Sequence, residues 1–281
     1  MKIIDSHLHL FNVDVGKYDW LAPENPPFWP DKSHIAKSFS EDALRLDDNL
    51  ALAGFVHIEA GFDNQHPWRE IDYLIATCKT PFSAVAGFDL LDEQGESVLR
   101  TLRQRKHVVG VRHILDDAAS EILTAPKSHD NFSLLENAGF CFDAQLSLGD
   151  SKGVEALVNI ARRYPRLSVV INHAGFPLAA SEQKWRDSLQ ALAACENVAI
   201  KLSGWEMHER QWQVAIITPW IARAIQQFGE DRVMLGSNFP LCTWRMQYAE
   251  YWSVVLACIP AHLQSKLAYH NTQNWYRVDV G

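Results

Sequence analysis

The sequence contains no run of eighteen apolar residues and no surplus of positive charge. Without such a run, no segment is predicted to span a bilayer. The net charge of −8 at pH 7 disfavours partners such as nucleic acid and anionic membranes, because both call for basic patches. We therefore expect a small-molecule substrate. The sequence gives no indication of the oligomeric state.

Paired cysteines and a targeting segment are also missing. The five cysteines are odd in number, scattered and never spaced as CxxC, so we interpret them as reduced thiols, mostly in the core. The chain runs from Met1 directly into a strand-like segment, which predicts that there is no signal peptide. Together these features predict a cytoplasmic protein.

A glycine-rich dinucleotide-binding turn is absent, which bears on the fold class. Strand-like and helix-like segments alternate, and from the second strand onward the repeat of about thirty residues matches one β-α unit. Eight units without a linker predict an α/β protein with a single (β/α)8 TIM barrel over residues 1–281. The alternative, an open doubly wound sheet, usually carries the missing turn. The expected strands are 2–9, 53–60, 82–89, 108–114, 139–146, 168–173, 197–203 and 232–238.

Capping residues and prolines indicate where helices begin. Ser40 is followed by two acidic residues, which predicts an N-cap with acids in the first turn. Proline is favoured at helix starts, so Pro67 and Pro219 predict helices that begin directly after them. Apolar residues at helical spacing predict further helices over 153–164 and 182–194.

The connection after the first strand, residues 11–39, is long and rich in tryptophan and proline. Its segment 20–30 holds too many prolines for a helix. In a barrel it would lie on the C-terminal face, and long loops in compact domains are commonly functional. We expect an aromatic lid over the pocket, with Trp29 against the substrate. The alternative is a loop that only packs on the barrel rim.

The first strand ends in His7-Leu8-His9. Side chains alternate along a strand, so His7 and His9 should point the same way, while Ile4 and Leu8 point toward the covering layer. Two converging imidazoles favour a metal or proton-transfer site. The alternative is two partly exposed histidines on an edge strand.

Polar side chains also end the other expected strands. Alternation places Val56 and Ile58 toward the helices, which leaves His57 and Glu59 facing inward, and it likewise turns Val109 outward. Burying such groups without partners would cost on the order of 1–3 kcal/mol each, so their concentration indicates a site. The resulting ring is His7, His9, His57, Glu59, Asp89, Arg112, Gln145, His173, Lys201 and Asn238.

Some of these polar groups have structural alternatives. Lys201 and Glu59 could pair with each other, and Asp143, which shares a face with Gln145, could cap a turn. His113 is out of phase with Arg112 and could point into the loop of strand four.

The motifs at these strand ends resemble the amidohydrolase superfamily, and within it the amidohydrolase 2 branch of sugar-acid lactonases and 2-pyrone-4,6-dicarboxylate lactonase. The resemblance covers nearly the whole chain and implies a distorted (β/α)8 barrel that hydrolyses a carbonyl compound, most often a lactone. The motifs are His-x-His at 7–9, Val-His-Ile-Glu-Ala at 56–60, Gly-Val-Arg-His at 110–113, Asn-His-Ala-Gly at 172–175, Lys-Leu-Ser-Gly at 201–204 and Gly-Ser-Asn-Phe-Pro at 236–240.

Two departures from the family pattern concern metal binding. The family usually has aspartate at the end of strand eight, as metal ligand and general base, where this chain has Asn238. An amide can coordinate through its oxygen but cannot accept a proton at neutral pH. The strand-five metal histidine is also absent, with Gln145 nearby. These departures disfavour two metals and leave two possibilities: one divalent cation such as zinc on His7, His9 and His173, or metal-independent hydrolysis.

The resulting hypothesis is attack of water on a ring-ester carbonyl. The carbonyl would be polarised by the metal or by His7, His9 and Lys201, while Asn238 orients the water. The proton would go to His173, His57 or Glu59. The expected substrate contacts are Arg112, His57, Lys201, Gln145 and Trp29, with Arg112 on a carboxylate or hydroxyl. The alternatives are a non-oxidative decarboxylase, a class that keeps the strand-eight aspartate, and a non-catalytic binding barrel.

Overall fold

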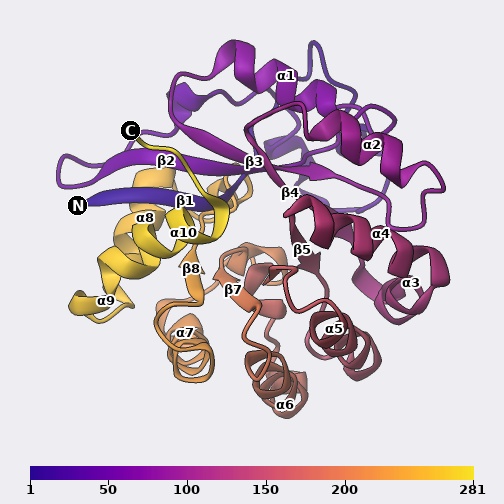
Figure 1. Ribbon diagram of the computed structural model, residues 1–281. Coiled ribbons are helices and arrows are strands. Elements are labelled where there is room, and N and C mark those ends of the chain that lie inside the picture. The colour runs from indigo at the N-terminus through magenta and orange to yellow at the C-terminus, as the bar shows by residue number, and fades with distance from the viewer.

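The computed structural model describes residues 1–281, and its eight strands form one parallel sheet in the order of the chain (Figure 1). The sheet curls into a barrel, and the segment after β8 meets β1 where the amide of Asn238 donates to the His7 carbonyl at 2.8 Å. The predicted (β/α)8 barrel is confirmed. The strands are β1 Lys2–Leu8, β2 Ala51–Ile58, β3 Phe82–Gly87, β4 Val108–Ile114, β5 Cys141–Gln145, β6 Val169–Ile171, β7 Val198–Leu202 and β8 Val233–Leu235.

Helices surround the barrel, except between β1 and β2, where short 3-10 turns replace a helix. None of the helices is both long and apolar enough to cross a membrane. They are α1 Trp68–Thr77, α2 Gly95–Leu102, α3 Ala119–Thr124, α4 Pro126–Ala138, α5 Ser151–Arg163, α6 Glu182–Ala193, α7 Val214–Phe228, α8 Tyr248–Ala257, α9 Ala261–Ser265, a π-helical turn Lys266–His270 and α10 Asn271–Tyr276.

The predicted helix starts are confirmed in part. Helix α1 follows Pro67, and α5 and α6 lie where helical spacing placed them. Ser40 caps only a 3-10 turn, in which its hydroxyl accepts a hydrogen bond from the Asp42 amide. The prediction for Pro219 is wrong, because α7 begins at Val214. Ile217 is buried against the barrel and holds the earlier turn in place, while Pro219 lies exposed within the helix.

Two apolar layers fill the protein. The outer layer, a cluster of 66 buried residues, packs the strands against the helices. The inner layer takes residues from all eight strands and forms the floor of the barrel, so the polar side chains at the strand ends lie above it. The inner layer consists of Ile4, Val56, Ile58, Val85, Val109, Cys141, Val170, Ala199, Met234, Tyr276 and Val278.

This floor corrects the expected faces of β1, β2 and β4. Val56, Ile58 and Val109 belong to the inner layer, not to the helix-facing side. Ile4 also lies inside, while Leu8 lies in the outer layer, because the pairing of β1 with β2 shifts register between Asp5 and Leu8. The sequence prediction was wrong here because parallel strands are covered on both faces, so apolar residues on either side leave the phase undetermined.

The loop of residues 11–39 is a packed element of the rim. Phe11 and Phe39 exchange backbone hydrogen bonds at its two ends, which closes the loop. Trp20 donates its indole N–H to the Ala60 carbonyl at 2.7 Å, and the loop shares a small apolar cluster with Phe62 and other residues after β2 and β8. Its function as a lid stays a prediction.

Candidate active site

The three predicted imidazoles meet at the C-terminal end of the barrel. The ring of His7 lies 5.1 Å from the ring of His9 and 4.5 Å from the ring of His173, measured between centroids. All three side chains are buried. His173 follows β6 with a φ of 54°, in the left-handed region that non-glycine residues seldom adopt. The three rings therefore form a buried group at the C-terminal end of the barrel. We call this group, His7, His9 and His173, the imidazole cluster.

The imidazole cluster is uncharged at neutral pH. The pKa of each histidine is lowered well below its ordinary value, first by burial and then by positively charged neighbours, which include Arg112 and Lys201. A neutral imidazole keeps one nitrogen lone pair for a metal ion or a proton. Both ring nitrogens of His7 are buried without any hydrogen-bond partner. The arrangement thus presents unused donors and acceptors at the mouth of the barrel.

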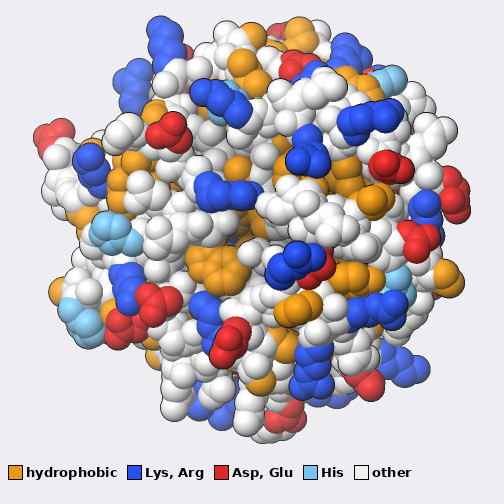
Figure 2. All heavy atoms as spheres, in the orientation of Figure 1, with side chains coloured by type: hydrophobic (Ala, Val, Ile, Leu, Met, Phe, Trp, Pro, Cys, Tyr) orange, Lys and Arg blue, Asp and Glu red, His pale blue; other side chains and the backbone are white.

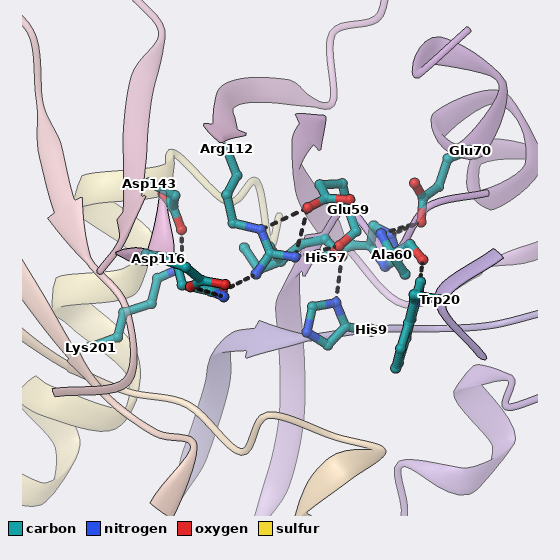
Figure 3. A network of polar contacts seen from close by, with 12 residues as sticks. His9, Trp20, His57, Glu59, Ala60, Glu70, Arg112, Asp116, Asp143 and Lys201 are labelled. Carbon is teal, nitrogen blue, oxygen red and sulfur yellow. Dashed lines mark hydrogen bonds and ion pairs between the residues drawn. The ribbon is translucent and has the colours of Figure 1, made fainter. Parts of the chain in front are cut away.

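Hydrogen bonds behind the cluster orient two of its rings. The His9 Nδ1–H donates to the Ile58 carbonyl at 2.8 Å, which leaves the Nε2 lone pair free (Figure 3). His173 Nδ1 lies 3.1 Å from the Ser203 hydroxyl. Histidines that bind metals are commonly fixed in this way by a bond from the other ring nitrogen.

Asn238 contacts a carboxylate that the sequence analysis did not identify. The Asn238 side-chain amide donates to Glu206 Oε1 at 2.6 Å, and the other oxygen of Glu206 has no partner. Glu206 is fully buried, and this burial raises its pKa from 4.5 to about 7. It lies in the turn after β7, beyond the strand end where we looked for site residues. The available signal was an acid flanked by Trp205 and Met207 directly after the Lys-Leu-Ser-Gly motif.

Arg112, Glu59 and Gln145 come together as the ring of strand ends predicted. The Arg112 guanidinium lies 2.7 Å from Glu59 Oε1 and also donates to the Glu59 carbonyl at 2.8 Å (Figure 3). Its Nη1 donates to Gln145 Oε1 at 3.1 Å. Gln145 in turn donates to Asp116 at 3.4 Å. The positive charge of Arg112 is therefore balanced by Glu59, and one N–H of its Nη1 stays uncommitted.

Lys201 lies deeper, in the interior of the barrel. Its ammonium group is 2.6 Å from Asp143 Oδ2, and neither side chain is exposed to solvent. Tyr276 donates its hydroxyl to the other oxygen of Asp143 at 2.7 Å. The alternatives of a Lys201–Glu59 pair and of Asp143 as a turn cap are wrong. The cause is the shared inward phase of β5 and β7, which aims both side chains at the barrel axis.

The remaining predicted residues lie at the edge of the site or behind it. His57 faces helix α1, contrary to its expected inward orientation, with its Nε2 3.0 Å from Glu70 Oε1. His113 accepts a hydrogen bond from the Leu90 amide in the loop after β3, which continues from Asp89. Trp29 is half-buried and contacts the ring of Trp244 edge-on, with 5.3 Å between centroids.

Two cavities adjoin the imidazole cluster and Arg112. A cavity of about 400 Å³ beside His173 is mainly apolar, with Phe176, Trp205 and Trp212 among its walls. A second cavity of about 820 Å³ beside Arg112 is polar and acidic. Its walls include Glu59, Asp63, Asn64, Gln65, Asp89, Asp92 and Arg112. On the face of the molecule in Figure 2, acidic and basic side chains are interspersed, with no large area of one sign.

The imidazole cluster suits a divalent cation by its chemistry. As the side chains lie, no three His, Cys, Asp or Glu residues form a preassembled metal site. However, three neutral imidazoles are a zinc donor set that leaves a fourth position for water. The unpartnered nitrogens of His7 and the oriented rings of His9 and His173 fit that use.

Comparison with known proteins assigns the family. A family model described as amidohydrolase matches residues 4–278. The chain is 30% identical over 299 residues to the uncharacterized protein y4mH of Sinorhizobium fredii, covering 99% of each chain. It is 25% identical over 283 residues to an L-fucono-1,5-lactonase of Burkholderia ambifaria, covering 96% of each chain. The structure resembles a zinc-bound amidohydrolase of Burkholderia multivorans with a TM-score of 0.83 and 21% identity, over 99% of this chain and 100% of that one. The chain therefore belongs to the amidohydrolase family, in its amidohydrolase 2 branch.

Proposed function

We propose that this protein hydrolyses the ring ester of a lactone. The observation that carries the proposal is the imidazole cluster, whose uncharged rings are buried at the barrel mouth with unused nitrogen atoms. Such groups can polarise a carbonyl and position water without a charged side chain. The relatives named as lactonases support the choice of a lactone as the carbonyl compound.

Each side chain of the site has a task in this reaction. His7, His9 and His173 would hold a divalent cation such as zinc, which supplies Lewis acidity when bound. The uncommitted N–H of Arg112 would donate to a ring hydroxyl or to the carbonyl oxygen of the substrate. Glu59 and Gln145 hold the guanidinium in place for that contact. On the helix side of β2, His57 contacts Glu70 and accepts a hydrogen bond from the Leu10 amide, just before the loop of residues 11–39.

The charges around the site favour an uncharged substrate. Arg112 is neutralised by Glu59 and Lys201 by Asp143, so neither offers a free positive charge to a carboxylate. Asp63 receives Lys17 and Arg69 at 3.3 and 2.6 Å, in the wall of the polar cavity. The polar cavity otherwise presents acids. We therefore infer a hydroxylated, uncharged lactone of the sugar-acid kind in preference to a pyrone dicarboxylate, whose carboxylates these walls would repel.

A panel of lactones with a pH indicator tests this proposal, since ring opening releases an acid. We expect turnover of uncharged sugar lactones to exceed that of carboxylated pyrones. His7→Ala should lower kcat/KM by at least about a hundredfold, on the scale of a lost general acid-base or metal contact. The exposed His262→Ala variant serves as the matched control.

Three outcomes would contradict the proposal. Release of carbon dioxide from an aromatic acid would indicate a decarboxylase. Binding of lactones without turnover would indicate a non-catalytic barrel. Wild-type activity in His7→Ala, His173→Ala and Arg112→Ala would mean that the site lies elsewhere.

A further inference from the structure

The end of strand eight presents a chemical gap in the proposed reaction. Asn238 stands where the family pattern has an aspartate, and an amide side chain cannot accept a proton from water at neutral pH. We infer that Glu206, held by Asn238, accepts the proton of the attacking water, so that the loop after β7 supplies the carboxylate that β8 lacks. This inference rests on the proposed lactone hydrolysis.

The position of Asn238 links Glu206 to the imidazole cluster. Its backbone amide donates to the His7 carbonyl at 2.8 Å, and its side-chain amide donates to Glu206 at 2.6 Å. Its side chain also lies beside His9. A φ of 58° at Asn238 turns the chain sharply at this point. One residue therefore touches both the strand that carries two of the imidazoles and the buried carboxylate.

Several buried polar atoms of these residues have no hydrogen-bond partner. Glu206 Oε2, Asn238 Oδ1 and both ring nitrogens of His7 are buried and have no hydrogen-bond partner. Buried polar atoms are rarely left in this state, because each unsatisfied group costs on the order of 1–3 kcal/mol. Water and a substrate carbonyl are groups that would satisfy both donors and acceptors here.

A purely structural role for Glu206 would call for a different set of contacts. Its charged neighbour is Arg210, which donates a hydrogen bond to the Glu206 backbone carbonyl. Arg210 forms its ion pair with Asp31, with Arg210 Nε 2.7 Å from Asp31 Oδ2. The other titratable groups facing Glu206 are Cys242 and Tyr251, both buried. The Glu206 carboxylate is therefore free of any ion pair, although a cation lies close to its backbone.

The local backbone explains how the chain brings Glu206 into the interior after β7. Gly204 has a φ of 66°, and a Cβ added there would collide with the His173 ring. This glycine lets the chain turn directly beside the His173 ring, and the following 3-10 turn, Trp205–Met207, buries Trp205 and Glu206. Burial raises the pKa of Glu206 to about 7, which suits a group that takes up and releases a proton near neutral pH.

The proposed step is balanced as follows. The water oxygen bonds to the lactone carbonyl carbon while one water proton moves to Glu206 Oε2. The tetrahedral intermediate then collapses, and the bond between the carbonyl carbon and the ring oxygen breaks. The proton on Glu206 passes to the leaving alkoxide oxygen, which regenerates the carboxylate. The products are a hydroxy acid, which ionises in solvent, and the unchanged enzyme.

The first test is Glu206→Gln, which keeps the shape of the side chain but removes the proton acceptor. We expect kcat to fall by about 10²- to 10⁴-fold, with KM changed by less than about threefold. The control is Glu196→Gln, which makes the same substitution at an exposed position after α6 and should leave activity unchanged. Circular dichroism and thermal unfolding establish that each variant is folded.

The second test moves the carboxylate back to strand eight. In the double variant Glu206→Gln and Asn238→Asp, the hydrogen-bonded amide and acid exchange places, and we expect kcat at least about tenfold above that of Glu206→Gln alone. A structural role for Glu206 does not lead to this rescue. Activity of Glu206→Gln within about threefold of the wild type, or failure of a folded double variant to recover, overturns the inference alone. Absence of lactone turnover in the wild type overturns the proposed function, and this inference with it.

Discussion

Replacement of Lys201 by methionine tests whether the centre of the barrel is held by an ion pair. The substitution removes the ammonium group 2.6 Å from Asp143 and leaves a carboxylate that has no exposure to solvent. The strong donor that remains is the Tyr276 hydroxyl at 2.7 Å, since the Cys141 thiol is 4.0 Å away. Removing one partner of a buried pair typically costs 3–5 kcal/mol, so we expect Lys201→Met to lose about 4 kcal/mol of unfolding free energy.

Urea unfolding followed by fluorescence measures this loss, because the chain has ten tryptophans. In thermal unfolding, the same loss should appear as a fall in Tm of roughly 10 °C. The comparison is the triple variant Lys201→Met, Asp143→Val and Tyr276→Phe, which removes all three polar groups together. Its stability should return close to that of the wild type, since apolar replacement of a complete buried pair is often neutral or stabilising.

Two results would refute this reasoning. A loss below about 1 kcal/mol in Lys201→Met would mean that water or another group compensates Asp143. A triple variant as unstable as the single variant would mean that packing, and not charge, sets the cost. The triple variant also tests the sequence prediction that Lys201 contacts the substrate: a folded triple variant with a KM raised at least about tenfold would support that contact.

Three further perturbations have expected outcomes. Burial raises the pKa of Glu206 from 4.5 to about 7, so the stability that this group contributes is full below pH 4.5 and is lost as the pH rises through about 7, by about 3 kcal/mol. In urea unfolding, Glu206→Gln should therefore be more stable than the wild type at about pH 8.5 but not at about pH 4. An equal difference in stability at both pH values would contradict this. Gly204→Ala should lower kcat/KM at least about tenfold and destabilise the fold by about 1–3 kcal/mol, because of its positive φ and the collision with His173; unchanged kinetics would show that the His173 ring can shift without cost. Protein purified without chelator should contain about one zinc per chain by elemental analysis, and His9→Ala should lose it; full activity after complete metal removal would favour the metal-independent route.

The sequence predicts the barrel and most strand-end groups because both follow from local periodicity. Alternation within β5 and β7 places Gln145 and Lys201 on the inward face correctly, since each strand mixes polar and apolar residues. Alternation fails in β2, where Val56 and Ile58 could face either layer and His57 finds its partner on helix α1.

Glu206 could not be predicted by the same reasoning. Its direction depends on the positive φ of Gly204 and on a 3-10 turn, and neither follows from a two-residue period. The partners of Arg112 and Lys201 likewise depend on which neighbouring strand brings a carboxylate to the same height. Such pairings depend on the curvature and stagger of the closed sheet, and the sequence pattern of a single strand does not determine either.

The floor of the barrel joins distant parts of the chain. Tyr276 and Val278 lie near the C-terminus and pack among residues of all eight strands, close to where the chain begins (Figure 1). During synthesis on the ribosome, strands made early must therefore wait for residues made late before their interior is sealed. Until then the nascent barrel would expose its apolar lining and leave Asp143 without the hydrogen bond from the Tyr276 hydroxyl. The last step of folding would therefore also complete the polar contacts of Asp143 in the interior of the barrel.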